Sequence, residues 1–521
     1  MTTRVLLCIF LAFPASLHAA PPKLDYFFPA GAQRGGTVTI TAAGTFAPWP
    51  VKAHVEGNGI DVKPAKASGK LDITIAKDAE PGVRWIRLYN DEGASVARPF
   101  LVGLLPEITE QEPNDDPKKP QVITQPSVVV NGRLGKTDDV DTFAVKLTKG
   151  QTLVASLEAH HTLRSPMDGV MQILSADGFV LEQNDDYHGL DPQIAFVAPK
   201  DGVYLVRIFA FPAMPDATVR FAGKETFIYR LTLTTGPYVE YAYPLAIPDS
   251  APTKVDLIGW NLPPDLQTTT VTPRPGASLL TLFDPRITGT FQVRQDPNPA
   301  IAKSATTREV VPPITITGKL EKRGDIDVYS FNARKGQKLA FRIESRTLGF
   351  PLDPVLIVTD SAGKVLVQNK AAKIGADPSL DFTATQDGAY RIEVRDLANS
   401  GSFRHAYRLR IAPPTPDFSL SVATDTFTLS AAKPLEIPVT ITRNGGFKGD
   451  IALRVEGAPK EVAVTTSAKG VTLRTTANTL FARPIRIIGT AKDGATRTAT
   501  VTLADFGRAT DSLWLTITAS R

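Results

Sequence analysis

Residues 131–153 read NGRLGKTDDVDTFAVKLTKGQTL, and residues 317–339 read TGKLEKRGDIDVYSFNARKGQKL. The two stretches share a glycine, a D-x-D pair and a Lys-Gly-Gln turn, in the same order and at the same spacing. The agreement continues well beyond them, which indicates a long internal repeat. We therefore expect two homologous modules, at about 107–236 and 294–413.

The rest of the chain predicts further β modules. Short runs rich in Val, Ile, Thr and aromatic residues recur along the 521 residues, and the 42 Pro and 38 Gly are spread between them. This pattern is typical of antiparallel sandwiches, and no long stretch has apolar residues at helical spacing. The fold class is predicted to be all-β, with immunoglobulin-like or IPT-like modules at 21–106 and 237–293 and an immunoglobulin-like sandwich at 414–521.

The first residues, MTTRVLLCIFLAFPASLHAA, indicate an exported protein. A single arginine precedes a short apolar stretch and a small-residue exit, as in a secretory signal peptide at 1–20. The apolar stretch is too short for a transmembrane helix, and we expect no transmembrane segment elsewhere. Because the one cysteine, Cys8, lies in this leader, we expect no disulfide, thiolate metal site or thiol catalysis in the mature chain. The net charge of +5 is dispersed, so nucleic acid is not an expected partner.

The repeat resembles the bacterial pre-peptidase C-terminal (PPC) domain. The matching residues are Glu112-Pro113-Asn114-Asp115, the D-x-D-x-[FY] motif of Asp139, Asp141 and Phe143, and the turn Lys149-Gly150-Gln151. The resemblance implies two jelly-roll β-sandwiches related to the collagen-binding domain of clostridial collagenases. It also implies a non-catalytic accessory of secreted peptidases or other surface enzymes.

Hard oxygen ligands gather in the first copy of the repeat. They are Glu112, Asn114, Asp115, Asp139 and Asp141. Calcium binds six to eight such oxygens, and alternate residues of one strand point to the same face. Some collagen-binding relatives hold calcium with this arrangement, so calcium is the predicted cofactor. The alternative is a solvated turn beside an exposed strand start.

The second copy has a weaker version of the same set. It keeps Asp325 and Asp327, and upstream it offers Asp296 and Asn298, with one carboxylate fewer. A calcium site there is the weaker prediction.

The sequence shows no motif of an enzyme. It has no H-E-x-x-H zinc motif and no G-x-S-x-G nucleophile elbow. We therefore expect a non-catalytic exported protein that binds a surface polymer, either glycan or protein. The alternative is an accessory or remnant of a secreted peptidase system. The ligand and the oligomeric state do not follow from the sequence.

Overall fold

The computed structural model describes residues 20–214, 217, 220–304, 308–371, 373, 375–476, 480–503 and 506–518. The predicted leader, with Cys8, lies outside the described residues except for Ala20. Within them the regular structure is almost all strand; the exceptions are the four-residue helix α1 (His160–Leu163) and the 3-10 turns η1 (Pro264–Leu266) and η2 (Arg346–Leu348). The all-β prediction is confirmed. None of the described helices has the length and hydropathy of a membrane span.

The N-terminal module is a sandwich of two sheets, β1-β3-β6-β5 and β2-β9-β7-β4, with β8 beside β7. Its core is lined by Leu24, Ile40, Ile73, Leu88 and Phe100. The strands are β1 (Lys23–Phe28), β2 (Gly31–Gln33), β3 (Thr37–Thr45), β4 (Lys52–Glu56), β5 (Ile60–Pro64), β6 (Lys70–Ile75), β7 (Gly82–Asn90), β8 (Gly93–Ala94) and β9 (Arg98–Gly103).

The two repeats have the same main sheet order. In the first repeat the sheets are β10-β12-β19-β14-β17 and β11-β13-β18-β15-β16. In the second they are β26-β27-β34-β29-β32 and β28-β33-β30-β31, and a single bridge between Glu309 and Ser330 stands where β11 pairs with β13. The strands of the first repeat are β10 (Glu107–Thr109), β11 (Gln121–Ile123), β12 (Ser127–Arg133), β13 (Asp141–Leu147), β14 (Thr152–Glu158), β15 (Met167–Ser175), β16 (Val180–Asn184), β17 (Gln193–Val197), β18 (Gly202–Pro212) and β19 (Ile228–Thr234). Those of the second are β26 (Ala300–Ala302), β27 (Ile314–Lys319), β28 (Ile326–Ala333), β29 (Lys338–Glu344), β30 (Pro354–Asp360), β31 (Val365–Lys370), β32 (Ser379–Thr383), β33 (Gly388–Asp396) and β34 (Ala406–Ala412).

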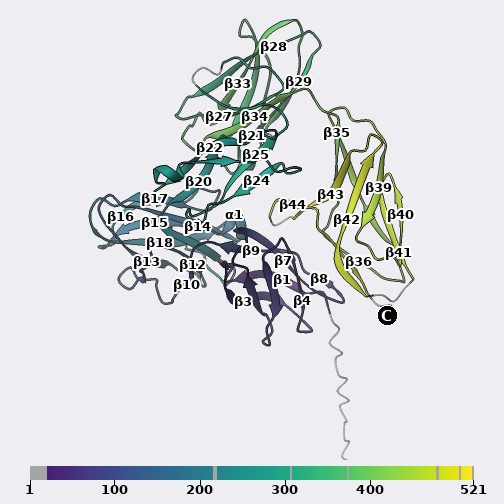
Figure 1. Cartoon of the computed structure of the whole chain (residues 1–521). Helices are drawn as coiled ribbons and strands as arrows, with labels where there is room; N and C mark the ends of the chain where they lie inside the picture. Colours follow the sequence, from purple (N-terminus) through teal and green to yellow (C-terminus); the bar gives the residue numbers. More distant parts are fainter. Residues whose placement is uncertain are drawn as a thin grey trace, which may run out of the picture.

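A smaller sandwich lies between the repeats, and a larger one follows them. The small module has sheets β20-β22-β23 and β21-β25-β24, made of β20 (Tyr238–Tyr243), β21 (Ala246–Pro248), β22 (Thr253–Trp260), β23 (Thr268–Val271), β24 (Leu279–Leu282) and β25 (Phe291–Asp296). The C-terminal module has the strands β35 (Asp417–Ser421), β36 (Thr426–Leu429), β37 (Leu435–Pro438), β38 (Thr440–Asn444), β39 (Ile451–Glu456), β40 (Val462–Ser467), β41 (Gly470–Thr475), β42 (Phe481–Ala491), β43 (Thr496–Leu503), β44 (Arg508–Thr510) and β45 (Leu513–Ile517). Figure 1 shows these modules in sequence order, from purple to yellow.

The small module is built like the N-terminal module. In both, the first strand pairs antiparallel with the third through a bulge, and the second strand pairs parallel with the last. Gly44 and Gly259 occupy the same place, where a Cβ would lie 2.0 Å from a carbonyl oxygen of the first strand. The duplicated unit is therefore a small sandwich followed by a repeat module, and it extends beyond the stretch recognised in the sequence.

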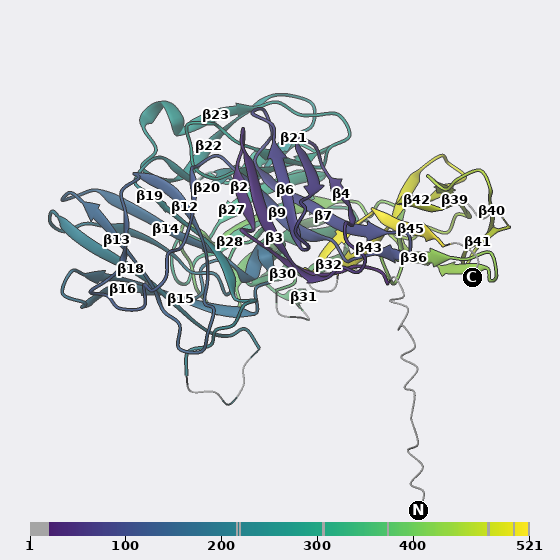
Figure 2. The ribbon, with the colours of Figure 1, turned by 90° about the horizontal axis from the view of Figure 1, so that it is seen from below.

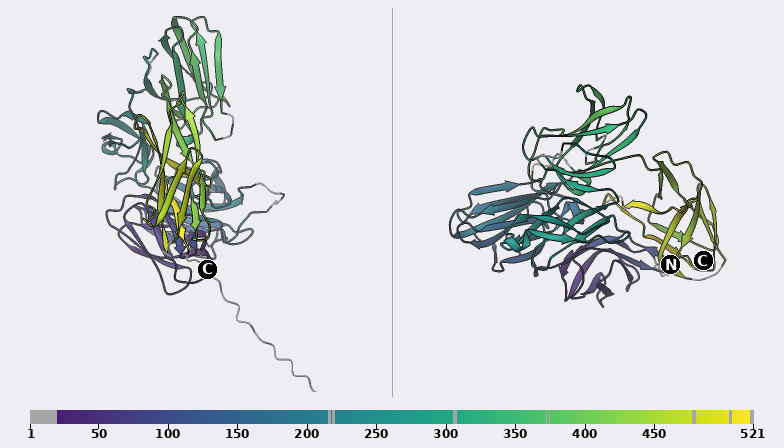
Figure 3. Two further views of the ribbon diagram at one scale, coloured as in Figure 1. Left: turned by 90° about the vertical axis from the view of Figure 1, so that its right-hand side faces the viewer. Right: turned by 45° about the horizontal axis from the view of Figure 1, so that its top comes forward.

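The last module packs on the first. Arg87 and Asp425 form a buried ion pair of 2.6 Å between them, and the Phe506 ring lies edge-on to Trp85. Figures 2 and 3 show the yellow C-terminal module beside the purple N-terminal module, so the chain folds back on itself.

Candidate functional site

The predicted calcium ligands of the first repeat lie where the segment after β10 meets the start of β13. One oxygen each of Glu112, Asp115 and Asp139 fall within 4.8 Å of one another. A second group of the same kind contains Glu110, Glu112 and Asp141, so Glu112 belongs to both. The segment docks on the D-x-D strand as expected, and the structure adds Glu110 to the set.

Backbone hydrogen bonds fix these carboxylates. The Val140 amide donates to Asp115 Oδ1 (3.3 Å), which ties the upstream segment to the strand start. The Gly135 amide donates to Asp139 Oδ2 (2.5 Å), and the Asn114 amide donates to Glu112 Oε2 (3.2 Å). The cluster is thus pre-organised by the main chain.

Several buried polar atoms of the cluster have no hydrogen-bond partner. Asn114 is only 1% exposed, and neither its Oδ1 nor its Nδ2 has one. Asp141 is fully buried, and its Oδ1 is likewise unpartnered. Buried polar atoms are rarely left so, and a hard cation would satisfy these oxygens. The residues present therefore fit calcium.

The buried and crowded carboxylates of the cluster have raised pKa values. Burial, assisted by the neighbouring Glu112, raises the pKa of Glu110 to about 7. Burial first, and then the charge of Glu110, raises the pKa of Asp141 well above its usual range. The ammonium of Lys136 lies 3.1 Å from Asp115 and 3.3 Å from Asp139, on the exposed side of the cluster. One lysine therefore compensates only part of a site with five carboxylates.

The second repeat carries its own cation at the corresponding place. Glu110 follows β10, and its backbone amide donates to the carbonyl oxygen of Asn131. In the same way Lys303 follows β26, and its backbone amide donates to the carbonyl oxygen of Thr317, which is the counterpart of Asn131. Lys303 therefore stands where the first repeat has Glu110, and its Nζ contacts Asp327, the counterpart of Asp141. In the second repeat an ammonium therefore faces the buried aspartate, where the first repeat has a carboxylate.

The remaining candidates of the second repeat lie apart. Asp296 is a buried residue of β25, which crosses the expected module boundary, and it pairs with Arg408 and accepts from the Thr315 hydroxyl. Asn298 donates to Asp296, and Asp325 caps a turn by accepting from two amides. Among the described residues, groups of three carboxylates that lie close enough together to hold one metal ion occur only in the first repeat. The structure does not bring the four predicted residues together.

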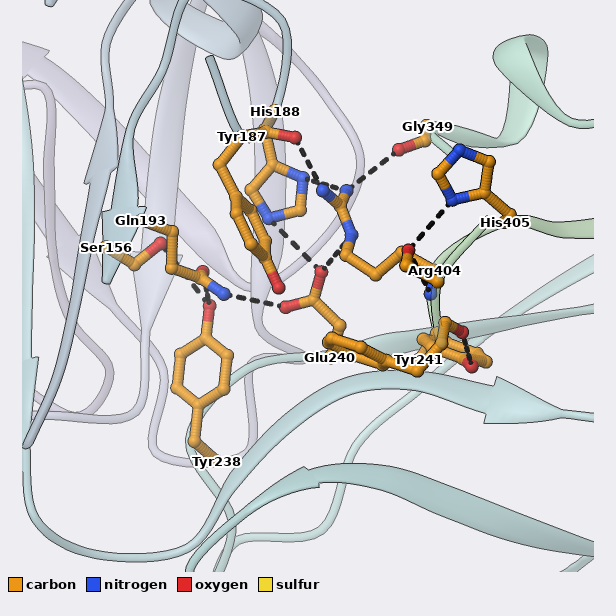
Figure 4. Close-up of polar contacts among 12 residues, drawn as sticks. Ser156, Tyr187, His188, Gln193, Tyr238, Glu240, Tyr241, Gly349, Arg404 and His405 are labelled. Atoms are coloured by element: carbon orange, nitrogen blue, oxygen red, sulfur yellow. Dashed lines mark hydrogen bonds and ion pairs between the residues drawn. The ribbon is translucent and has the colours of Figure 1, made fainter. Parts of the chain in front are cut away.

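A second polar centre joins three modules (Figure 4). Arg404 of the second repeat donates to the carbonyl of Tyr187 (2.6 Å) and lies 2.9 Å from Glu240 of the small module. His188 Nδ1 lies 3.1 Å from Arg404 Nη2, and Gln193 donates to Glu240. Burial, with the charge of Arg404, lowers the pKa of His188 to about 3, so this imidazole is neutral at neutral pH. The sequence does not reveal this centre because its members come from three modules.

Comparison with known families identifies the repeats. Residues 139–210 and 325–396 match the sequence profile of the bacterial pre-peptidase C-terminal domain. The two repeats are PPC domains. No curated protein matches the chain.

Among solved structures, the PPC domain of a collagenase from Bacillus anthracis matches at 17% identity, covering 22% of this chain and 97% of that one, with a TM-score of 0.17. The glucan-utilisation protein SGBP-B of Bacteroides ovatus, in complex with a mixed-linkage heptasaccharide, matches at 9% identity over 75% of this chain and 76% of that one, with a TM-score of 0.16. The insect immune protein hemolin matches at 9% identity over 92% and 99%, with a TM-score of 0.21. At these TM-scores none of the three matches bears on function.

Proposed function

We propose that this chain is a non-catalytic, exported binding protein whose first PPC domain holds calcium. The observation that carries the proposal is the pair of carboxylate groups that share Glu112, next to the buried side chain of Asn114, whose polar atoms have no hydrogen-bond partner. Calcium takes this mixture of carboxylate and amide oxygens in flexible geometry.

The second PPC domain supports the assignment by contrast. There Lys303 places a fixed positive charge on the aspartate that corresponds to Asp141. The same fold thus meets the same need for positive charge in two ways, with a lysine in one copy and an ion in the other.

The role of the ion would be structural. Glu110, Glu112 and Asp115 belong to the segment that leaves the N-terminal module, whereas Asp139 and Asp141 belong to the sandwich. An ion held by both would clamp the segment to the domain and fix how the N-terminal module is presented. A rigid array of sandwiches suits a protein that binds a surface polymer. The second candidate function is that of an accessory protein to a secreted peptidase, which the description of the PPC family favours.

Calorimetric titration tests the calcium site directly. The chain from Ala20 onward should bind calcium at one centre, and Glu112→Gln should weaken the affinity at least tenfold because Glu112 belongs to both acidic groups. Glu225→Gln, an exposed change in the same domain, is the matched control and should bind as the unmodified chain does. Equal affinity in the Glu112 variant would refute the site.

A further inference from the structure

A cavity of about 430 Å³ opens beside the three-module centre of Figure 4. Its walls come from the small module, the second PPC domain and α1 of the first PPC domain. They include Leu279, Thr290, Phe291, Arg346, Phe350 and His161. This volume lies within the range of small-ligand sites in proteins.

The floor of the cavity is rigid. Arg404 is nearly fully buried and is bonded to the carbonyl oxygens of Tyr187 and Gly349 as well as to Glu240. These bonds hold the three modules together, so the cavity is formed before any ligand arrives. A preformed site loses little conformational entropy on binding.

The charges of the cavity are balanced. Each of its three arginines has a carboxylate partner: Arg404 has Glu240 (2.9 Å), Arg294 has Glu344 (3.1 Å) and Arg346 has Asp353 (2.6 Å). His188 adds no charge at neutral pH. An anion or a cation would therefore meet no unpaired opposite charge, which favours a neutral ligand.

Hydrogen-bonding groups remain free on the walls. Arg346 uses its Nε for Asp353, and its two Nη groups have no partner among the described residues. The side chains of Thr290 and Gln292 also have none among the described residues. Phe291 and Phe350, which are 5% and 7% exposed, contribute a small apolar part of the wall beside them. The hydroxyl groups of a sugar both donate and accept hydrogen bonds, so they pair with such groups.

The corresponding place in the first unit is covered by another part of the chain. Val83 and Leu279 occupy the same register in the two small sandwiches, and Arg164 and Gly349 are the left-handed residues that end the same turn in the two PPC domains. In the first unit, Phe506 of the C-terminal module packs with Val83, and its carbonyl accepts from Arg164 (2.8 Å). Phe506 therefore covers in the first unit the place that is open in the second.

We propose that the open groove is a binding site for a neutral sugar unit of a surface glycan. The inference rests on the proposed binding function and names its ligand class. The site is distinct from the calcium site, because no residue that lines the cavity belongs to the acidic groups of the first PPC domain.

A glycan array with neutral and acidic members, probed with the chain from Ala20 onward, tests the inference. Neutral glycans should bind, and the affinity for the best of them, measured by titration, should fall at least tenfold in Thr290→Trp, which fills the groove. Arg346→Ala should weaken binding several-fold. The matched controls are Thr124→Trp, on an exposed loop of the first PPC domain, and Arg342→Ala, which removes a surface pair in the second. Equal melting temperatures confirm that the variants are folded.

Each other result overturns the inference. Binding of acidic glycans alone contradicts the neutral ligand, and neutral binding that survives Thr290→Trp contradicts the groove while leaving a glycan-binding function intact. Absence of glycan binding refutes the sugar assignment. The calcium titration is unaffected by any of these results, so failure of the inference is distinguishable from failure of the calcium site.

Discussion

Residues that are identical in the two PPC domains make the same packing contacts and hydrogen bonds in both. Gly132 and Gly318 each lie under a tyrosine ring, where a Cβ would be 2.3 Å and 2.2 Å away. The tyrosine hydroxyl then reaches the second aspartate of the D-x-D pair, as Tyr229 does with Asp141 at 2.6 Å. Asp191 accepts from three amides at α1 and Asp377 does the same at η2, so the two aspartates have the same structural role.

Lys303 gives the first prediction. Its removal in Lys303→Ala leaves buried Asp327 without its ammonium, so the second PPC domain should lose about 1–3 kcal/mol of stability. Differential scanning calorimetry should show a lower melting temperature. Lys322→Ala, at an exposed position of the same domain, is the control, and an equal change in both variants would contradict the role of Lys303.

Glu110 gives a pH-dependent prediction. Its folded pKa is raised from 4.5 to about 7, so without calcium the stability that it contributes is present below about 4.5 and is lost as pH rises through about 7. In chelator at pH 8, Glu110→Gln should therefore raise the melting temperature, because the amide carries no charge to bury. The same variant should lose most of the calcium response. A lower melting temperature in chelator would contradict the crowding of carboxylates.

At the scale of elements, the sequence predicts the sandwiches well and the site in part. The D-x-D strand and the upstream segment meet as expected because both motifs sit beside the same strand start. Glu110 was missed, although it stands two residues before Glu112 as Asp139 stands before Asp141. The second-copy set failed because Asp296 belongs to β25 of the preceding module, and because only strand pairing shows that Lys303 corresponds to Glu110.

The contact between the first and last modules gives a prediction at this scale. Asp425→Ala leaves Arg87, which is 1% exposed, buried without its carboxylate, and the cost of such a change is about 3–5 kcal/mol. The C-terminal module should undock, which small-angle X-ray scattering would show as a larger radius of gyration. Asp450→Ala removes an exposed pair of the same module and is the control. An unchanged radius would show that the apolar contacts hold the modules without the ion pair.

For the whole molecule, sequence patterns of single modules do not predict how the modules pack. The pair Arg87–Asp425 joins residues 338 positions apart, and the centre around Arg404 draws on three modules. Neither contact follows from periodicity or motif, because each depends on the relative placement of folded domains.

The most direct test of the calcium clamp is the melting temperature of the chain from Ala20 onward in millimolar calcium and in chelator. An ion at a hundredfold excess over its Kd stabilises the folded state by about 2.7 kcal/mol. We therefore predict that calcium raises the melting temperature of the transition that contains the first PPC domain, that chelator reverses the rise, and that Glu112→Gln makes it smaller. Identical melting in calcium and chelator would contradict the clamp and reduce the acidic cluster to a solvated turn.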